Sequence, residues 1–386
     1  MKILTSLKVL DLTNGIPYIG TMFADYGAEV IKIETPGHGD SIRRRGSVDG
    51  EKEGPYVSYY MRGKKSIAVD YTNPAGAEFI KKLAAKADMI VFSTAEEKNA
   101  AYGLSYEDIK AVNPAIIYGV LTPFGEEGPW KDLPDYDLIV MAKGGLMEKT
   151  GFPEKPTKFG APIAYLYASW HLTAGMLAAH LKAQETGEGM KVSCSSWQTV
   201  MEIDDTFAEC LQALNTLPKR FGNGFPTTNP TDTFKCKNGW FALSIGSDDQ
   251  WLSFAHEAGM DDKWGEGTIY GHDPARSMEH YFGDLDIQLW DYFAGITIEE
   301  ADMICKKAMV PGGPCNTVEE LMTDEQVADR GMLIKVDGVT QYGIPAKFLG
   351  WDDLDDEIAS APVLGQDTDK YITEEEQNKL REAGAM

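Results

Sequence analysis

The chain has 386 residues, of which 43% are hydrophobic and 25% charged, as in ordinary soluble globular proteins. Its 60 acidic and 36 basic side chains give a formal net charge of −24, which argues against nucleic acid or an anionic membrane as a partner, because phosphate contacts need clustered Lys and Arg. The five cysteines are scattered without metal-ligand spacing, no apolar run reaches about 18 residues, and no signal peptide is expected. These features predict a cytoplasmic protein with no metal site and no membrane span.

The first segments of the chain predict a doubly wound α/β fold. Residues 7–11 form a short apolar run typical of a buried parallel strand, residues 14–17 a turn, and residues 19–25 a helix. A second strand is expected at residues 29–34. This order of strand, turn, helix and strand begins an α/β fold. Because no G-x-G-x-x-G follows the first strand, nothing here indicates NAD.

The same alternation continues along the next part of the chain. Strands are expected at residues 66–70, 89–92 and 116–121, and helices at residues 75–87 and 106–112. Strands that alternate with helices predict a parallel sheet with helices on its faces.

A long apolar helix is expected at residues 165–184. Small residues occupy most of its faces, and larger ones recur at helical spacing: Leu166, Trp170, Thr173, Ala174, Leu177 and Leu181. Such a helix is expected to be buried on several sides, at the centre of a large domain or in a subunit interface. Gly187 is the expected left-handed C-cap, and residues 191–195 alternate as a strand.

The rest of the chain begins with a turn-rich boundary at residues 222–230. A hairpin is expected at residues 233–246, with Asn238-Gly239 at its turn. Helices are expected at residues 247–259 and 373–382.

Several sequence motifs, taken together, resemble the class III coenzyme A (CoA) transferases. This CaiB/BaiF group includes formyl-CoA:oxalate transferase, the carnitine and bile-acid CoA transferases and α-methylacyl-CoA racemase. The pattern G-A-E-V-I-K-I-E-x-P-G-x-G-D-x-x-R spans residues 27–43, and G-x-P-I-A spans residues 160–164. Further landmarks lie at residues 186–195, 317–331 and 343–368, so the resemblance covers nearly the whole chain.

The resemblance implies an architecture and an activity. Residues 1–224 and 316–386 are expected to form a large Rossmann-like domain, and residues 225–315 a smaller α+β domain. Two subunits of the family pass through each other as interlocked rings. The implied activity is transfer of CoA between an acyl-CoA, such as succinyl-CoA, and a carboxylic acid, with CoA as substrate and no permanently bound cofactor.

One position departs from the family pattern at the centre of the chemistry. Relatives carry an aspartate directly after the segment that matches residues 162–164, and this chain carries Tyr165. In the family that carboxylate attacks the acyl-CoA and then becomes the acyl part of an enzyme-bound CoA thioester. A phenol, with a pKa of about 10, has no carbonyl and cannot take this part.

Two further candidate catalytic residues lie near Tyr165 in the family topology. Tyr136 stands where racemases have a histidine, which argues against racemisation because that reaction needs an acid–base pair. Asp137 is the second candidate, and its alternative role is to cap or charge a helix N-terminus. The acids that could replace the missing aspartate are Asp135, Asp137, Glu148 and Glu154, each of which could equally be a solvated surface acid.

The expected CoA contacts come from two segments. Gly15 and Ile16 lie in a loop, about two residues shorter than in relatives, that touches CoA in the family. Arg62, Lys64 and Lys65 match the segment that holds the CoA phosphates, although a solvated basic turn is an alternative. Glu96 and Glu97 replace the family's N-F-x-P-G loop, which weakens the case for a nucleotide contact there.

Three hypotheses follow. The first is a catalytically incomplete subunit of a heteromer, completed by an aspartate-bearing paralogue as in the benzylsuccinate-type CoA transferases. The second is an active homodimeric CoA transferase, or a CoA-dependent lyase or isomerase, with a relocated catalytic acid. The third is a non-catalytic acyl-CoA binding protein.

Overall fold

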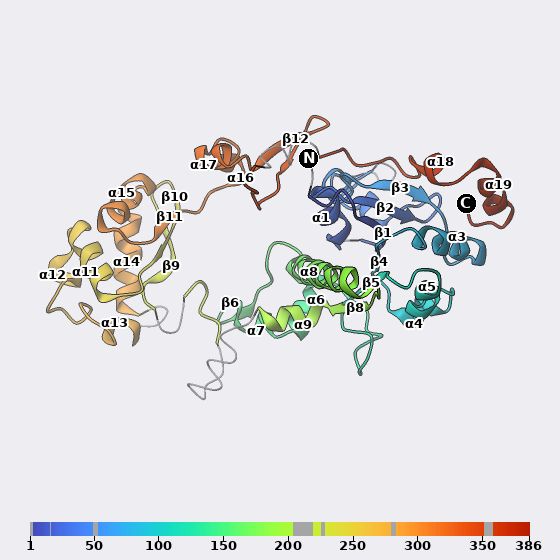
Figure 1. The fold of residues 1–386 in the computed structure, drawn as a ribbon. Helices are drawn as coiled ribbons and strands as arrows, with labels where there is room; N and C mark the ends of the chain where they lie inside the picture. Colours follow the sequence, from blue (N-terminus) through green and yellow to red (C-terminus); the bar gives the residue numbers. More distant parts are fainter. Residues whose placement is uncertain are drawn as a thin grey trace. The chain divides into compact units, whose positions relative to one another are not determined.

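The computed structural model describes residues 3–15, 17–48, 53–203, 219–224, 228–278, 283–350 and 358–386. The chain divides into two compact units (Figure 1). The first unit comprises residues 1–146, 159–205 and 325–386, and the second comprises residues 147–158 and 206–324.

The first unit is built on a six-stranded parallel sheet. Its strand order is β3-β2-β1-β4-β5-β8, and all five neighbouring pairs are parallel. The strands are β1 (Lys8–Leu12), β2 (Glu29–Glu34), β3 (Lys65–Ala68), β4 (Met89–Phe92), β5 (Ile117–Thr122) and β8 (Lys191–Ser195). This order confirms the predicted doubly wound fold, and it reverses direction between β1 and β4.

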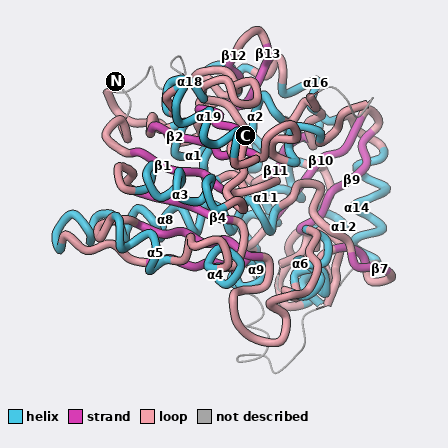
Figure 2. Tube along the Cα trace, turned by 90° about the vertical axis from the view of Figure 1, so that its right-hand side faces the viewer, coloured by secondary structure: helices cyan, strands magenta, loops and turns pink. Residues whose placement is uncertain are grey.

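Helices cover both faces of this sheet. One face packs against α1 (Ile19–Asp25) and α8 (Ile163–Thr186). The other face packs against α3 (Pro74–Ala84), α5 (Tyr106–Val112) and α19 (Glu374–Glu382). Figure 2 shows β1, β2 and β4 in magenta among the cyan helices α1, α3 and α8.

Helix α8 contacts the sheet through alanines together with Leu172 and Met176. The stripe that is buried against β1, β4 and β5 includes Ala168, Leu172, Met176, Ala179 and Ala183. Trp170 and Leu181 are instead 45% and 64% exposed, so the expected burial on several sides is not reached within one chain. Gly187 ends the helix with a φ of 75°, which confirms the predicted left-handed cap.

The remaining elements of the first unit are short. They are η1 (Ser41–Arg44), α2 (Val57–Tyr60), α4 (Glu96–Ala100), α6 (Asp137–Lys143), α9 (Ser196–Glu202), α17 (Glu325–Asp329), β12 (Leu333–Val336), β13 (Val339–Tyr342) and α18 (Thr368–Tyr371). Helix α7 (Leu146–Lys149) lies where the sequence passes into the second unit.

The second unit has its own core of aromatic side chains. Its antiparallel sheet has the order β11-β10-β9, and large buried side chains such as Trp251, Phe254 and Trp264 fill the space between sheet and helices. The predicted hairpin is present, but its turn lies at Lys237 and Asn238, one residue earlier than expected. The elements are β6 (Gly151–Phe152), β7 (Lys155–Pro156), β9 (Thr231–Cys236), β10 (Gly239–Ser244), α11 (Asp248–Glu257), α12 (Asp261–Trp264), α13 (Ala275–Met278), α14 (Asp284–Ala294), α15 (Ile298–Ala308), β11 (Gly312–Pro314) and α16 (Val318–Leu321).

Candidate active site

A pocket of about 790 Å³ lies within the first unit, where several parallel strands end. Its wall includes residues at or just beyond the carboxyl ends of β1, β4, β5 and β8: Asn14, Gly15, Ser93, Thr94, Thr122 and Ser196. In doubly wound sheets, ligands bind outside the carboxyl ends of the strands where the strand order reverses. The pocket between the ends of β1 and β4 occupies this place.

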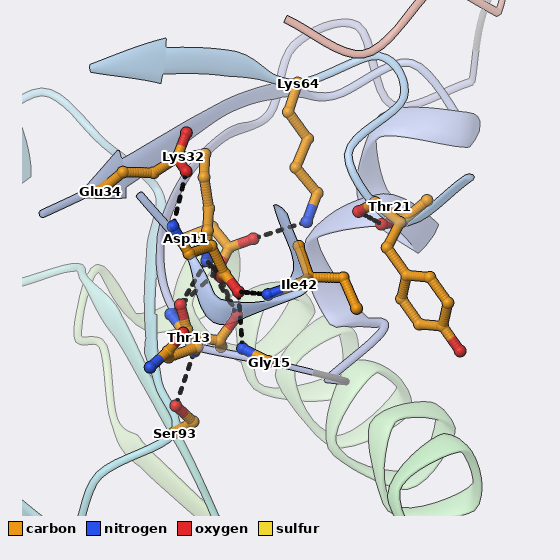
Figure 3. A network of polar contacts seen from close by, with 12 residues as sticks. Asp11, Thr13, Gly15, Thr21, Lys32, Glu34, Ile42, Lys64 and Ser93 are labelled. Carbon is orange, nitrogen blue, oxygen red and sulfur yellow. Dashed lines mark hydrogen bonds and ion pairs between the residues drawn. The ribbon is translucent and has the colours of Figure 1, made fainter. Parts of the chain in front are cut away.

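The loop after β1 has no described backbone N–H left over for a ligand. The N–H of Thr13 donates to Asp11 Oδ1 at 3.0 Å, that of Asn14 to Ser93 Oγ at 2.8 Å, and that of Gly15 to Asp40 Oδ1 at 2.8 Å (Figure 3). In many nucleotide-binding folds, backbone N–H groups at this position bind phosphate. Here side chains must supply any positive charge that an anionic ligand requires.

A buried ionic cluster packs against this loop and hydrogen-bonds to it. Lys32 Nζ lies 3.3 Å from Asp11 and 2.8 Å from Asp40, and Lys64 Nζ lies 2.9 Å from Asp11 (Figure 3). All four residues are at most 5% exposed. Burial by itself raises the pKa of Asp11, but Lys32 and Lys64 outweigh it and hold that pKa well below its usual range. The cluster is therefore ionised and internally paired.

The three cations expected to hold phosphate, Arg62, Lys64 and Lys65, differ in their burial and in their partners. Arg62 is 1% exposed, and its guanidinium binds Asp25 at 2.7 Å and 2.8 Å. Lys64 belongs to the buried cluster, and Lys65 lies on β3 with a partly buried side chain. None of the three is among the described residues that line the pocket. Their role in phosphate binding stays a prediction; of the two expected loop contacts, Gly15 lines the pocket and Ile16 lies outside the described residues.

Other cations do line the pocket. Arg45, Lys98 and Lys131 come from three separate segments, so no single sequence motif marks them. Lys131 Nζ forms an ion pair with Glu97 at 2.8 Å. The neighbouring acid, Glu96, pairs with a lysine as well, Lys191. The two acids that weakened the case for a nucleotide contact are therefore each paired with a lysine.

Tyr165 and Asp135 form a hydrogen-bonded pair on the pocket wall. Tyr165 lies in the first turn of α8, and its phenol donates to Asp135 Oδ2 across 30 residues of sequence. Burial raises the pKa of Tyr165, and the hydrogen bond and charge of Asp135 raise it further, so the phenol stays protonated. Tyr136 also lines the pocket and is 61% exposed.

Asp137 supports the start of α8 and lies next to this pair in sequence. It is the first residue of α6 and is 5% exposed, and its Oδ1 accepts the backbone N–H of Ala164 at 3.1 Å. This contact matches the capping role foreseen for it, and a catalytic role stays a prediction.

Ser169 links the same turn of α8 to the loop after β1. Its hydroxyl donates to the carbonyl of Tyr165 at 2.7 Å and accepts the N–H of Tyr18 at 3.0 Å. The loop and the position of the missing aspartate are thus held together.

Residues 4–368 match CoA-transferase family III. The chain belongs to this family. It is 30% identical over 362 residues to the succinate–glutarate CoA-transferase of Agrobacterium fabrum, covering 89% of this chain and 87% of that protein. It is 31% identical over 369 residues to the acetyl-CoA:oxalate CoA-transferase of Acetobacter aceti, covering 93% and 92%. A crystal structure of a CaiB/BaiF family protein from Brucella suis matches with a TM-score of 0.85 at 29% identity, covering 98% of this chain and 99% of that one.

Membership in the family makes this chain a CoA transferase by class, and the family's substrates are CoA thioesters. Two of the acids considered as replacements for the missing aspartate, Glu148 and Glu154, belong to the second unit, where Glu148 pairs with Arg220 at 3.1 Å. Among the described residues, no group of three or more His, Cys, Asp or Glu could hold a metal ion. None of the described helices is long and apolar enough to cross a membrane.

Proposed function

We propose that this chain transfers CoA between an acyl-CoA, such as succinyl-CoA, and a carboxylic acid, and that the pocket at the carboxyl ends of the strands binds the CoA. The observation that carries the proposal is the convergence of Arg45, Lys98 and Lys131 with the Tyr165–Asp135 pair in one pocket. A volume of about 790 Å³ suits a small-molecule substrate.

The cations of the pocket support binding of the CoA nucleotide. CoA is a polyanion, and its phosphates are bound best by charge-assisted hydrogen bonds from Lys and Arg. Because the described N–H groups of the loop after β1 already have partners in the protein, side chains supply this charge. The names of the two relatives, one for succinate and glutarate and one for oxalate, support a dicarboxylic acid as a substrate. CoA is the substrate of this reaction, and no permanently bound cofactor is needed.

The alternative is a catalytically incomplete subunit of a heteromer. Tyr165, at the position of the family's aspartate, is the observation that favours it, because a phenol cannot form the enzyme-bound thioester. An aspartate-bearing paralogue would then supply the carboxylate. An assembly as an interlocked homodimer goes with the first proposal, and a non-catalytic acyl-CoA binding protein is the remaining alternative.

The test uses the purified chain without any partner. It is mixed with succinyl-CoA and a panel of mono- and dicarboxylic acids, and the acyl-CoA products are identified by mass spectrometry. New acyl-CoA formed by the chain alone supports the proposal and excludes the heteromer. Calorimetric binding of CoA without turnover favours the heteromer or the binding protein. Absence of both binding and turnover refutes the proposal and the binding protein and leaves the heteromer.

The pocket assignment has its own matched pair of variants. Lys131→Ala removes a pocket cation, whereas Lys182→Ala removes a lysine that pairs with Glu185 on the exposed side of α8. Lys131→Ala is expected to weaken CoA binding several-fold more than Lys182→Ala. Equal effects of the two variants would place the CoA phosphates elsewhere.

A further inference from the structure

We propose that Asp135 is the carboxylate that accepts the acyl group and then carries CoA, and that Tyr165 positions it. The inference rests on the proposed function, and it names a nucleophile within this chain. Its basis is the contact between the phenol of Tyr165, which stands at the family's aspartate position, and the carboxylate of Asp135.

The other carboxylates of the pocket are distinguished by their contacts. Glu97 is paired with Lys131 at 2.8 Å, and Glu126 with Lys191 at 2.8 Å. A carboxylate that is held by a lysine is a weaker nucleophile, because its negative charge is partly neutralised.

Two aspartates of the pocket wall remain, Asp132 and Asp135, and both are exposed. Asp135 is the one that the structure joins to Tyr165. Asp137 lies beside them in sequence, but its Oδ1 accepts the N–H of Ala164 and its side chain is 5% exposed. Asp135 thus combines access to a ligand with a fixed position at the first turn of α8.

The reaction on Asp135 proceeds through anhydrides and a thioester. A carboxylate oxygen of Asp135 attacks the thioester carbon of the acyl-CoA, the C–S bond breaks, and CoA leaves as a thiolate. The thiolate attacks Cγ of Asp135 in the resulting mixed anhydride, which releases the first acid and leaves an Asp135–CoA thioester. The second acid attacks that Cγ and expels the thiolate, which then attacks the carbonyl of the new acyl group. This releases the new acyl-CoA and restores the Asp135 carboxylate, with no oxidant, reductant or net proton required.

Tyr165 has a defined part in these steps. Its hydrogen bond to one oxygen of Asp135 leaves the other oxygen to attack. When Cγ becomes tetrahedral, the oxygen that faces Tyr165 carries the negative charge, and the phenol donates a hydrogen bond to it. Donors of this kind, fixed before the reaction, lower the barrier most where charge develops.

The experiment compares Asp135→Asn with Asp291→Asn, a substitution of the same type at an exposed residue of α14 outside the pocket. Asp135→Asn is expected to lower kcat by at least about 1000-fold, as for loss of a covalent nucleophile, while calorimetry shows CoA bound as in the wild type. Asp291→Asn is expected to stay within about 3-fold of the wild type, as for loss of a surface charge. Tyr165→Phe is expected to lower kcat by about 100-fold, with a smaller effect on KM.

Chemical trapping identifies the residue directly. Hydroxylamine added during turnover converts an aspartyl-CoA thioester to a hydroxamate, which peptide mass spectrometry locates. A hydroxamate on Asp135 supports the inference. Label on another acid, full transfer activity of Asp135→Asn, or a wild-type chain that binds CoA but transfers nothing each overturns it. A wild-type chain that does not bind CoA refutes the proposed function itself.

Discussion

Asp11→Asn tests whether the buried cluster beneath the pocket loop stabilises the first unit through its charges. The substitution keeps the size of the side chain and one oxygen, but it removes the charge that Lys32 and Lys64 share. Lys32 retains Asp40 at 2.8 Å, whereas Lys64 loses the carboxylate that its Nζ binds at 2.9 Å. Removing one partner of a buried ion pair costs about 3–5 kcal/mol of stability, because the remaining charge is left without compensation in a low dielectric.

Urea unfolding at pH 7 and at pH 3 measures this cost. The folded-state pKa of Asp11 is depressed, so its contribution to stability is complete above the ordinary aspartate pKa of about 4 and falls as the pH drops below that value. The difference between wild type and Asp11→Asn is therefore expected to be largest at pH 7 and smaller at pH 3. Glu185→Gln, which breaks an exposed pair with Lys182, serves as control and is expected to change little. A loss below about 1 kcal/mol at pH 7 would refute the reasoning, because it would show that the cluster's attraction only offsets its desolvation.

Three further variants test other contacts. Glu97→Gln releases Lys131 for a ligand phosphate and is expected to lower the KM for acyl-CoA about two- to five-fold at low salt with kcat unchanged; an unchanged or higher KM in steady-state kinetics would contradict this. Ser169→Ala removes two hydrogen bonds of a buried hydroxyl, including the one to Tyr165, and is expected to destabilise the protein by about 1–3 kcal/mol in urea unfolding. Wild-type stability would contradict this and would mean that a water replaces the hydroxyl. Gly189→Ala would place its Cβ 2.0 Å from a backbone carbonyl, so thermal unfolding is expected to show a loss of at least about 1–3 kcal/mol; wild-type stability would mean that the backbone there moves freely.

The elements of the first unit could be predicted because their apolar runs are short and bounded by turns. The expected helix 19–25 and the strands 29–34 and 89–92 have the bounds that the structure gives to α1, β2 and β4. The face of α8 could not be predicted from the size of its side chains. Its alanines pack on the sheet together with Leu172 and Met176, whereas Trp170 and Leu181 are exposed.

The buried cluster had a sequence signal that composition alone does not reveal. Asp11 and Lys32 each interrupt an apolar strand, and the parallel register of β1 and β2 places them opposite each other. A charge within a buried strand is costly unless it is paired, so two opposite charges on adjacent strands indicate a pair. Lys64, directly before β3, adds a second cation to Asp11, at a place where the sequence indicated a solvated or phosphate-binding turn.

The candidate site was less predictable because its residues converge only in the folded chain. In the sequence, four acids were equally good candidates to replace the missing aspartate, and Asp135 was one of them. Its contact with Tyr165 spans 30 residues. The pocket cations Arg45, Lys98 and Lys131 follow three different strands and share no motif. Spacing along the chain carries no information about such long-range contacts.

The backbone N–H groups of the loop after β1 already have acceptors, and this affects how the ligand preference of the protein could change. All four described N–H groups of residues 13–18 already have acceptors inside the protein, so the loop gains nothing by rearranging around an incoming anion. Selectivity then rests with side chains on other loops, which evolution can exchange one at a time. The sheet can therefore stay unchanged while the substrate preference changes from one acid to another.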